Sequence, residues 1–128
     1  MLRHSKFELF ARWLFYTAVI VGCAAAFLPA NQALHAQFSD KLMHGVGFFG
    51  LAMLAHLGHR SSPFYLLFIV LSCLGLVIEL VQAFLPYRSF SLLGWGADIL
   101  GIVVYLAFAG CVRQLIYRQR FSDSRTSE

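Results

Sequence analysis

The sequence predicts an all-α integral membrane protein, a bundle of four transmembrane helices with both termini in the cytoplasm. Of its 128 residues, 59% are hydrophobic and only 12% are charged, whereas a soluble domain carries about 25% charged residues. The charged residues leave four long uncharged segments, and a helix needs about 20 mostly apolar residues to cross the hydrocarbon core. Lysine and arginine also gather on one side of the predicted spans, which sets their orientation.

Each predicted helix lies in or around one uncharged segment. The four expected helices cover residues 13–28, 42–57, 64–85 and 92–116. The first has a longer apolar core than a signal peptide, so we expect it to stay uncleaved. The second is short, so it should begin nearer residue 38, recruit its polar ends or lie in locally thinned bilayer. We expect one transmembrane domain over residues 1–128, with short cytoplasmic tails.

The positive charges decide the predicted orientation, because Lys and Arg accumulate in short cytoplasmic segments. An even number of spans puts both termini on one side. Only Lys41 and Arg88 fall on the opposite side. The eight cations on the side of the termini are Arg3, Lys6, Arg12, Arg60, Arg113, Arg118, Arg120 and Arg125. We therefore expect a multi-pass protein of the inner, or plasma, membrane, whose basic tail contacts anionic membrane lipids rather than nucleic acid.

Seven polar residues are not explained by hydrophobicity, and ionisable residues inside a span usually mark function. They are Asp40, Lys41, His44, Glu79, Gln82, Arg88 and Asp98. Asp40 and His44 are four residues apart, and Glu79 and Gln82 are three apart, so each pair shares one face of its helix. The rise of about 1.5 Å per residue places all seven toward the outer ends of the helices. The sequence therefore predicts one polar site in the outer leaflet.

Charge favours mutual pairing within this polar site. Its three acids and two bases sum to −1 with His44 neutral and to 0 with it protonated, and buried charges are tolerated when paired and hydrogen-bonded. No spacing matches a dedicated metal site, so we expect no metal and no cofactor. Single cysteines in three different spans, Cys23, Cys73 and Cys111, are expected as small core residues.

Each candidate residue also has a structural explanation. The charged residues near helix ends can be interfacial anchors, His44 can be a packing residue and Gln82 can join two helices by a hydrogen bond. Glu79 and Asp98 lie several residues inside apolar segments, which favours a pocket role. The small residues expected to let helices approach are Gly45, Gly47 and Gly50, with the pairs Gly22/Ala26 and Ala97/Gly101.

Three of these fragments, in this order, resemble the VanZ-like family. They are Asp40-Lys41-x-x-His44, Glu79-x-x-Gln82-x-x-x-Pro86-x-Arg88, and Asp98 on the last helix; the resemblance covers about residues 38–109. It implies a small multi-helix membrane protein. The family is named after a protein associated with teicoplanin resistance, and most members have no established biochemical activity. The chain departs from the expected pattern at Ile102, in place of an Asn, and at Tyr105, in place of a Gly.

Several functions stay open at this point. The leading hypothesis is an envelope protein whose polar site binds a lipid-linked or amphiphilic ligand, with glycopeptide resistance as one consequence. An enzyme on a lipid headgroup would use Glu79 or Asp98 as general base and Lys41, His44 or Arg88 to stabilise an anion. Ion passage would require an oligomer, because four helices are few for a pore. A non-catalytic accessory subunit, stabilised by buried ion pairs, is the fourth alternative.

Overall fold

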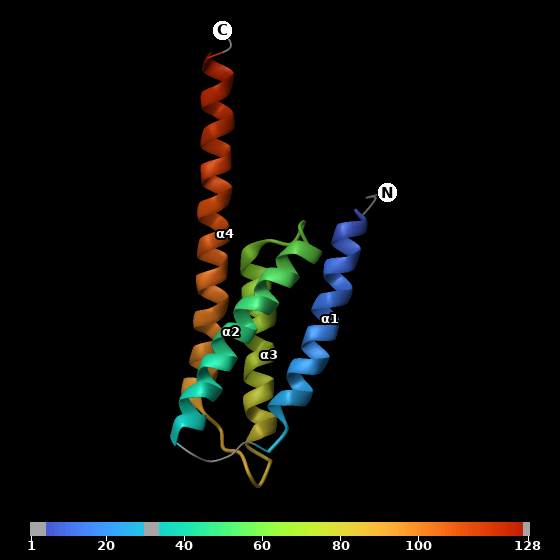
Figure 1. Ribbon diagram of the computed structural model, residues 1–128, viewed down its shortest axis with the longest axis vertical. Helices are drawn as coiled ribbons and strands as arrows, with labels where there is room; N and C mark the ends of the chain where they lie inside the picture. The colour runs from blue at the N-terminus through green and yellow to red at the C-terminus, as the bar shows by residue number, and fades with distance from the viewer. Residues whose placement is uncertain (1–4, 30–33, 127–128) are drawn as a thin grey trace.

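The computed structural model describes the backbone of residues 5–29 and 34–126, and the side chains of residues 5–29 and 39–120. These ranges are all-helical, as predicted, with four helices: α1 (Lys6–Ala26), α2 (Leu34–Gly58), α3 (Phe64–Gln82) and α4 (Leu92–Thr126). Consecutive helices run in opposite directions, so α1 begins and α4 ends on the same side of the bundle (Figure 1). We call this side the terminal end, and the opposite side, with residues 83–91 between α3 and α4, the loop end.

The helix ends differ from the predicted ones where something other than hydrophobicity ends a helix. α1 begins at Lys6 rather than at residue 13, because the Ser5 hydroxyl accepts a hydrogen bond from the Glu8 N–H at 3.2 Å and caps the first turn. α3 ends at Gln82 rather than at 85, ahead of Pro86, whose ring disrupts a helix. α2 and α4 are both longer than predicted, because polar helix-forming residues continue them beyond the apolar segments.

Three helical segments are long and apolar enough to cross a membrane: Lys6–Ala26, Phe64–Gln82 and Leu92–Arg120. The prediction of four spans is therefore supported for three helices, and α2 is outside this set. α2 packs against all three other helices, and its interface with α4 is the largest in the bundle. Such a central helix can carry polar residues that face protein, which lowers its overall hydrophobicity.

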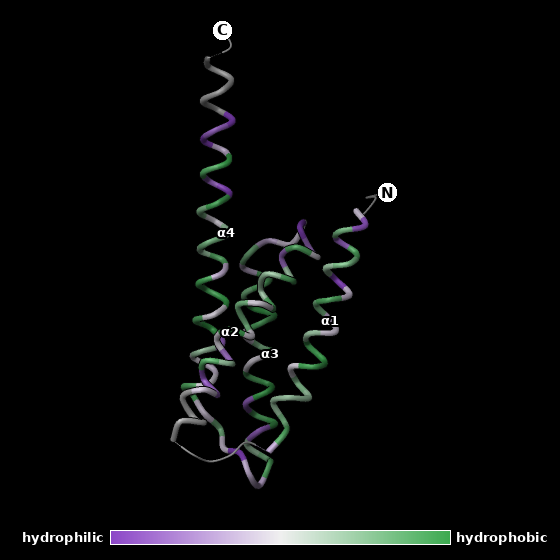
Figure 2. The backbone as a smooth tube through the Cα atoms, viewed as in Figure 1, coloured by the Kyte–Doolittle hydropathy of each residue, from purple (hydrophilic) through white to green (hydrophobic). Residues whose placement is uncertain are grey.

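Apolar side chains cover the outside of the molecule as well as its interior. The buried core between α2, α3 and α4 is small and includes Leu71 and Ile102, which are 1% and 0% exposed. Large apolar side chains such as Trp13, Val70 and Phe108 are exposed on the outer faces. Figure 2 shows α4 mostly hydrophobic beside the other helices and mixed where it projects beyond them. A soluble monomer rarely exposes a contiguous apolar patch above about 600 Å², so these surfaces indicate a membrane protein.

Glycine gives the closest contact between α2 and α4. A Cβ on Gly101 would collide with the carbonyl oxygen of Gly45, and a Cβ on Gly45 would lie 3.4 Å from the carbonyl oxygen of Ala97. These small residues bring the two helices together, as expected for residues of this type. Gly22, Gly47 and Gly50 do not follow that expectation, because a Cβ at any of these positions meets nothing within 4 Å. They border open space instead.

Candidate functional site

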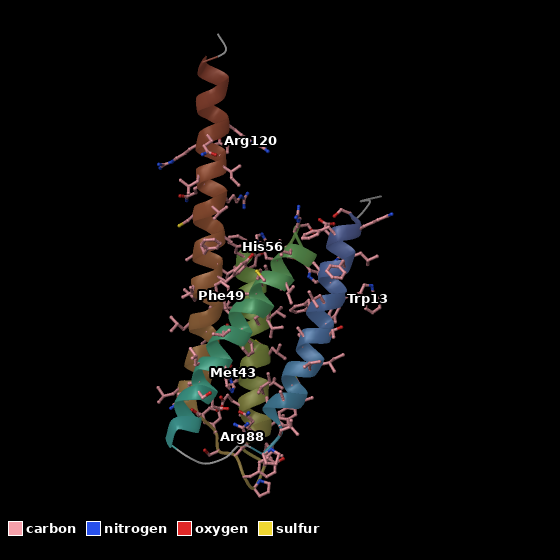
Figure 3. The ribbon with its side chains drawn as sticks, viewed as in Figure 1. Trp13, Met43, Phe49, His56, Arg88 and Arg120 are labelled. Carbon is pink, nitrogen blue, oxygen red and sulfur yellow. The ribbon has the colours of Figure 1, made fainter. Side chains whose placement is uncertain are left out.

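A cavity of about 300 Å³ lies between α1, α2 and α3 and reaches toward the loop end. Its lining is mostly apolar. Polar side chains are contributed by Asp40, His44 and Arg88, and the apolar lining includes Gly22, Cys23, Gly47, Leu51 and Leu74. Figure 3 places Arg88 and Met43, which both line this cavity, toward the loop end, and His56 and Trp13 toward the terminal end.

The cavity exists because α1 packs only loosely against α3, and because glycines on α1 and α2 leave part of the space between the helices unfilled. α1 packs mainly against α2 and only slightly against α3, and Figure 1 shows α1 diverging from α3 toward the terminal end. Gly22 on α1 and Gly47 on α2 line the space that is left. Larger residues at these two positions would occupy part of it, since a Cβ there meets no neighbour within 4 Å.

Arg88 connects the loop end to both α1 and α2. Its Nη1 donates a hydrogen bond to Asp40 Oδ1 at 3.0 Å, and its Nη2 donates to the carbonyl oxygen of Leu28 at 3.3 Å. The Arg88 side chain is 13% exposed and the Asp40 side chain 40%. Arg88 Nε is buried and has no hydrogen-bond partner among the described residues. Arg88 therefore lines the cavity with a guanidinium that uses two of its five N–H donors, while Asp40 extends to the outside.

His44 and Asp98 form a second contact between ionisable side chains, after that of Arg88 with Asp40. Nδ1 of His44 lies 2.9 Å from Oδ1 of Asp98, and Asp98 is 0% exposed while the His44 side chain is 10% exposed. The contact orients the imidazole ring and leaves Nε2 as the ring nitrogen free of Asp98. Asp98 itself does not line the cavity, so it acts there by positioning His44.

The second oxygen of Asp98 is tightly enclosed. Asp98 Oδ2 is buried without a hydrogen-bond partner among the described residues. It lies against Gly75 of α3, where an added Cβ would be 2.6 Å away. The three helices α2, α3 and α4 thus meet at His44, Gly75 and Asp98. A residue larger than glycine at position 75 would force Asp98 to move.

Glu79 has a structural role rather than a place in the cavity. It is 1% exposed, and its Oε2 accepts a hydrogen bond from the backbone N–H of Ser91 at 2.8 Å. Ser91 precedes α4, and its hydroxyl accepts from the Gly94 N–H at 3.0 Å. A Cβ on Gly94 would collide with Glu79 Oε1. Glu79 therefore caps α4 from a neighbouring helix, where a carboxylate also meets the positive end of the helix dipole.

Gln82 also has a structural contact, at the end of α1. The last carbonyl groups of a helix have no partner within it, and three side chains from the loop end supply partners here. Gln82 Nε2 donates to the Ala26 carbonyl oxygen at 2.8 Å, and the Tyr87 hydroxyl donates to that of Phe27 at 2.9 Å. The third donor is Arg88, as described above. The interhelical role predicted as an alternative for Gln82 is thus the one observed.

The predicted polar site is therefore divided into two groups. Asp40, His44 and Arg88 meet at the cavity, with Asp98 behind His44. Glu79 and Gln82 lie in helix-end contacts outside it. Lys41 is half-buried and does not line the cavity. Within the predicted site, Arg88 contacts Asp40 and His44 contacts Asp98.

A further polar pair at the terminal end was missed by the sequence analysis. His56 Nδ1 lies 2.8 Å from the Tyr105 hydroxyl, and Tyr105 is 6% exposed. His56 also stacks edge-on against Phe64, with ring centroids 5.0 Å apart. Tyr105 follows Asp98 by two helical turns on one face of α4, and that spacing was the available signal. Ile102, 0% exposed, lies between these two polar positions along α4.

Metal coordination is not favoured by the side chains around the cavity. Within the described ranges, no three His, Cys, Asp or Glu side chains converge as metal ligands. Cys23 is half-buried in the cavity wall, whereas Cys73 and Cys111 are exposed. The expectation that the cysteines are core residues is therefore wrong for the last two, because those helix faces point outward.

The chain was compared with protein-family models, with curated proteins and with solved structures. None of the three comparisons finds a match.

Proposed function

We propose that the chain is a multi-pass protein of the bacterial inner membrane that binds a lipid-linked or amphiphilic envelope ligand in the cavity between α1, α2 and α3. The observation that carries this proposal is the cavity itself: an apolar space of about 300 Å³ with Asp40, His44 and Arg88 in its wall. Ligand pockets of this kind are mostly apolar and have a few polar groups that orient the ligand.

The proposed topology is a bundle of four spans with both termini in the cytoplasm. α2 has 25 residues, so at about 1.5 Å per residue it is about 37 Å long, more than the hydrocarbon core of about 30 Å. Cations at the terminal end include Arg12 and Arg60; the guanidinium of Arg60 lies 5.5 Å from the Phe7 ring of α1. Arg3 lies outside the described residues, and so does the side chain of Arg125. The excess of cations at the terminal end supports placing it in the cytoplasm.

The proposed relationship to the VanZ-like family rests on the motif residues. The contacts Arg88–Asp40 and His44–Asp98 join the three motif fragments in pairs. The two departures from the family pattern are also accommodated, because Ile102 is buried and the Tyr105 hydroxyl contacts His56. Resistance to an amphiphilic glycopeptide such as teicoplanin would be one consequence of ligand binding.

The contacts weaken two of the other functions. An enzyme with Glu79 as general base would need that carboxylate at the ligand, whereas Glu79 accepts from Ser91 and caps α4. Ion passage along the carboxylates would have to cross the buried apolar side chain of Ile102 between the two polar pairs. The non-catalytic accessory subunit is the alternative that the experiment below separates from ligand binding.

The test is to fill the cavity without disturbing the helices. Gly47→Leu places a side chain where a Cβ meets nothing within 4 Å, and we expect it to displace the ligand. The matched control is Gly50→Leu on the same helix, because a Cβ there also meets nothing within 4 Å and Gly50 does not line the cavity. Both proteins and the unchanged protein are extracted in native membrane discs, and bound molecules are identified by mass spectrometry.

We expect an amphiphile bound to the unchanged protein and to Gly50→Leu, and about a tenfold lower occupancy in Gly47→Leu, the change that a loss of about 1.4 kcal/mol in binding produces. A protein that carries no specific molecule in any of the three forms would contradict the proposal and favour the accessory subunit.

A further inference from the structure

We infer that the ligand of this cavity is a single-chain amphiphile with an uncharged, hydroxyl-bearing headgroup. The inference rests on the proposed function and narrows it to one chemical class. Three features carry it: the size of the cavity, the charge balance of its polar groups and the hydrogen-bonding groups that are still available there.

The size of the cavity favours one apolar chain. About 300 Å³ is at the lower end of the range for ligand pockets, about 300 to 1,000 Å³. The lining residues on α2 extend from Asp40 to Leu51, a length of about 16 Å at 1.5 Å per residue. A narrow space of this length accepts one extended chain. A lipid with two chains would have to leave one of them outside.

The loose contact between α1 and α3 supplies a route from the bilayer. These two helices share the smallest helix interface in the bundle and diverge toward the terminal end (Figure 1). The polar groups of the cavity lie toward the loop end, where Figure 3 places Arg88. A chain that enters between α1 and α3 would therefore have its tail inside the bilayer and its headgroup near the membrane surface.

The charge balance disfavours an anionic headgroup. The groups that line or directly support the polar part of the cavity are Asp40, Arg88, His44 and Asp98. Their formal charge is −1 with a neutral imidazole and 0 with a protonated one. Lys41 does not line the cavity, and the buried Glu79 adds a further negative charge nearby. An added anion would be left without a counter-charge in surroundings of low polarity, which is strongly unfavourable.

Arg88 does not change this conclusion, because its single positive charge is already counted in this balance and is paired with Asp40. Nη1 donates to Asp40 and Nη2 donates to the Leu28 carbonyl oxygen. An anionic headgroup that drew the guanidinium away from Asp40 would leave that carboxylate without its counter-charge. A neutral headgroup needs no such exchange.

The groups that remain available match a hydroxyl. The Arg88 guanidinium carries five N–H donors, of which the contacts above use two, so donors remain on this cavity-lining side chain. Asp40 is 40% exposed and accepts through the oxygen that Arg88 does not use. A hydroxyl donates one hydrogen bond and accepts others, so a headgroup with two hydroxyls can satisfy both side chains at once.

The test uses two probes that differ only by a phosphate. A 1-monoacylglycerol and the corresponding 1-acylglycerol phosphate carry the same photoreactive chain, and each is added to the full-length protein in discs of zwitterionic phospholipid. A diacylglycerol with the same chain tests the preference for one chain. Crosslinked peptides are quantified by mass spectrometry in the unchanged protein, Gly47→Leu and Gly50→Leu.

We expect the monoacylglycerol to label α1 and α2 at least about tenfold more than the phosphate-bearing probe or diacylglycerol, because a like-charge contact costs several kcal/mol. Asp40→Asn removes one negative charge at a half-exposed position and keeps the oxygen that Arg88 contacts. It should raise labelling by the anionic probe and reduce the preference.

The outcomes separate this inference from the proposed function. Equal or stronger labelling by the anionic probe, or by diacylglycerol, with labelling still lost in Gly47→Leu, overturns the headgroup or chain assignment and leaves the cavity as a binding site. Labelling that is the same in the unchanged protein and in Gly47→Leu, for every probe, overturns both.

Discussion

At the residue scale, the site depends on one buried carboxylate held between three helices. Asp98 orients His44 through one oxygen, while its second oxygen lies against Gly75. The space at position 75 is therefore occupied by Asp98, which is 0% exposed and is held at its other oxygen by His44. Position 75 requires glycine because Asp98 approaches it closely, and not because the backbone there has an unusual conformation.

We predict that Gly75→Ala lowers the free energy of unfolding by about 1 to 3 kcal/mol, the range for overpacking a buried position. The measurement is unfolding of the detergent-solubilised protein by a denaturing detergent. Gly96→Ala is the control, because Gly96 is exposed on α4 and a Cβ there meets nothing within 4 Å. Equal stability of the two variants would show that Asp98 does not occupy this position.

At the element scale, the helices are completed by side chains from their neighbours. Glu79 of α3 caps the first turn of α4, Gln82 and Tyr87 donate to the carbonyl oxygens of Ala26 and Phe27 at the end of α1, and Arg88 donates to that of Leu28 just beyond it. Such contacts matter in a bilayer, because no water is present to replace them. Glu79 and Gln82, which the sequence suggested for the ligand site, therefore join helices instead.

We predict that Glu79→Ala destabilises the fold by about 1 to 3 kcal/mol, because the Ser91 N–H loses its buried acceptor. Glu79→Gln keeps an acceptor oxygen and should lose less, about 0.3 to 1 kcal/mol from the helix dipole. Folded protein of either variant should bind the ligand as the unchanged protein does, when unfolding and mass-spectrometric occupancy are measured on the same samples. Full stability with ligand binding abolished in Glu79→Gln would instead place Glu79 in the site.

At the scale of the whole molecule, a small buried core is surrounded by exposed apolar side chains. α2 contacts all three other helices and carries Asp40 and His44 toward the cavity. This central position explains how a less apolar helix can belong to the same bundle as three strongly apolar ones. It also brings His44 against Asp98 and Asp40 against Arg88, so that these ionisable groups are paired.

We predict that reporters fused after Glu128 and inserted at Arg60 are cytoplasmic, while one inserted at Arg88 is external. The reason is the excess of cations at the terminal end, eight against two over the whole sequence. At each position, a phosphatase fusion and a fluorescent-protein fusion together report whether that position is external or cytoplasmic. An external C-terminus would contradict either the four spans or their orientation.

The sequence by itself determined that the chain is all-helical with four helices, because hydrophobicity along the chain is a local property that needs no knowledge of neighbours. Three of the four predicted spans are long and apolar enough to cross a membrane. It also identified the polar residues in and near the apolar segments, whose burial requires an explanation. Only the tertiary structure decided which of them share a site. The rotation of α3 turns Glu79 and Gln82 toward helix ends, the rotation of α2 turns Asp40 and His44 toward the cavity, and the segment between α3 and α4 carries Arg88 there. The loose packing of α1, with Gly22 and Gly47 facing open space, creates that cavity, because an unfilled volume is a property of three helices together and has no signature in any one of them.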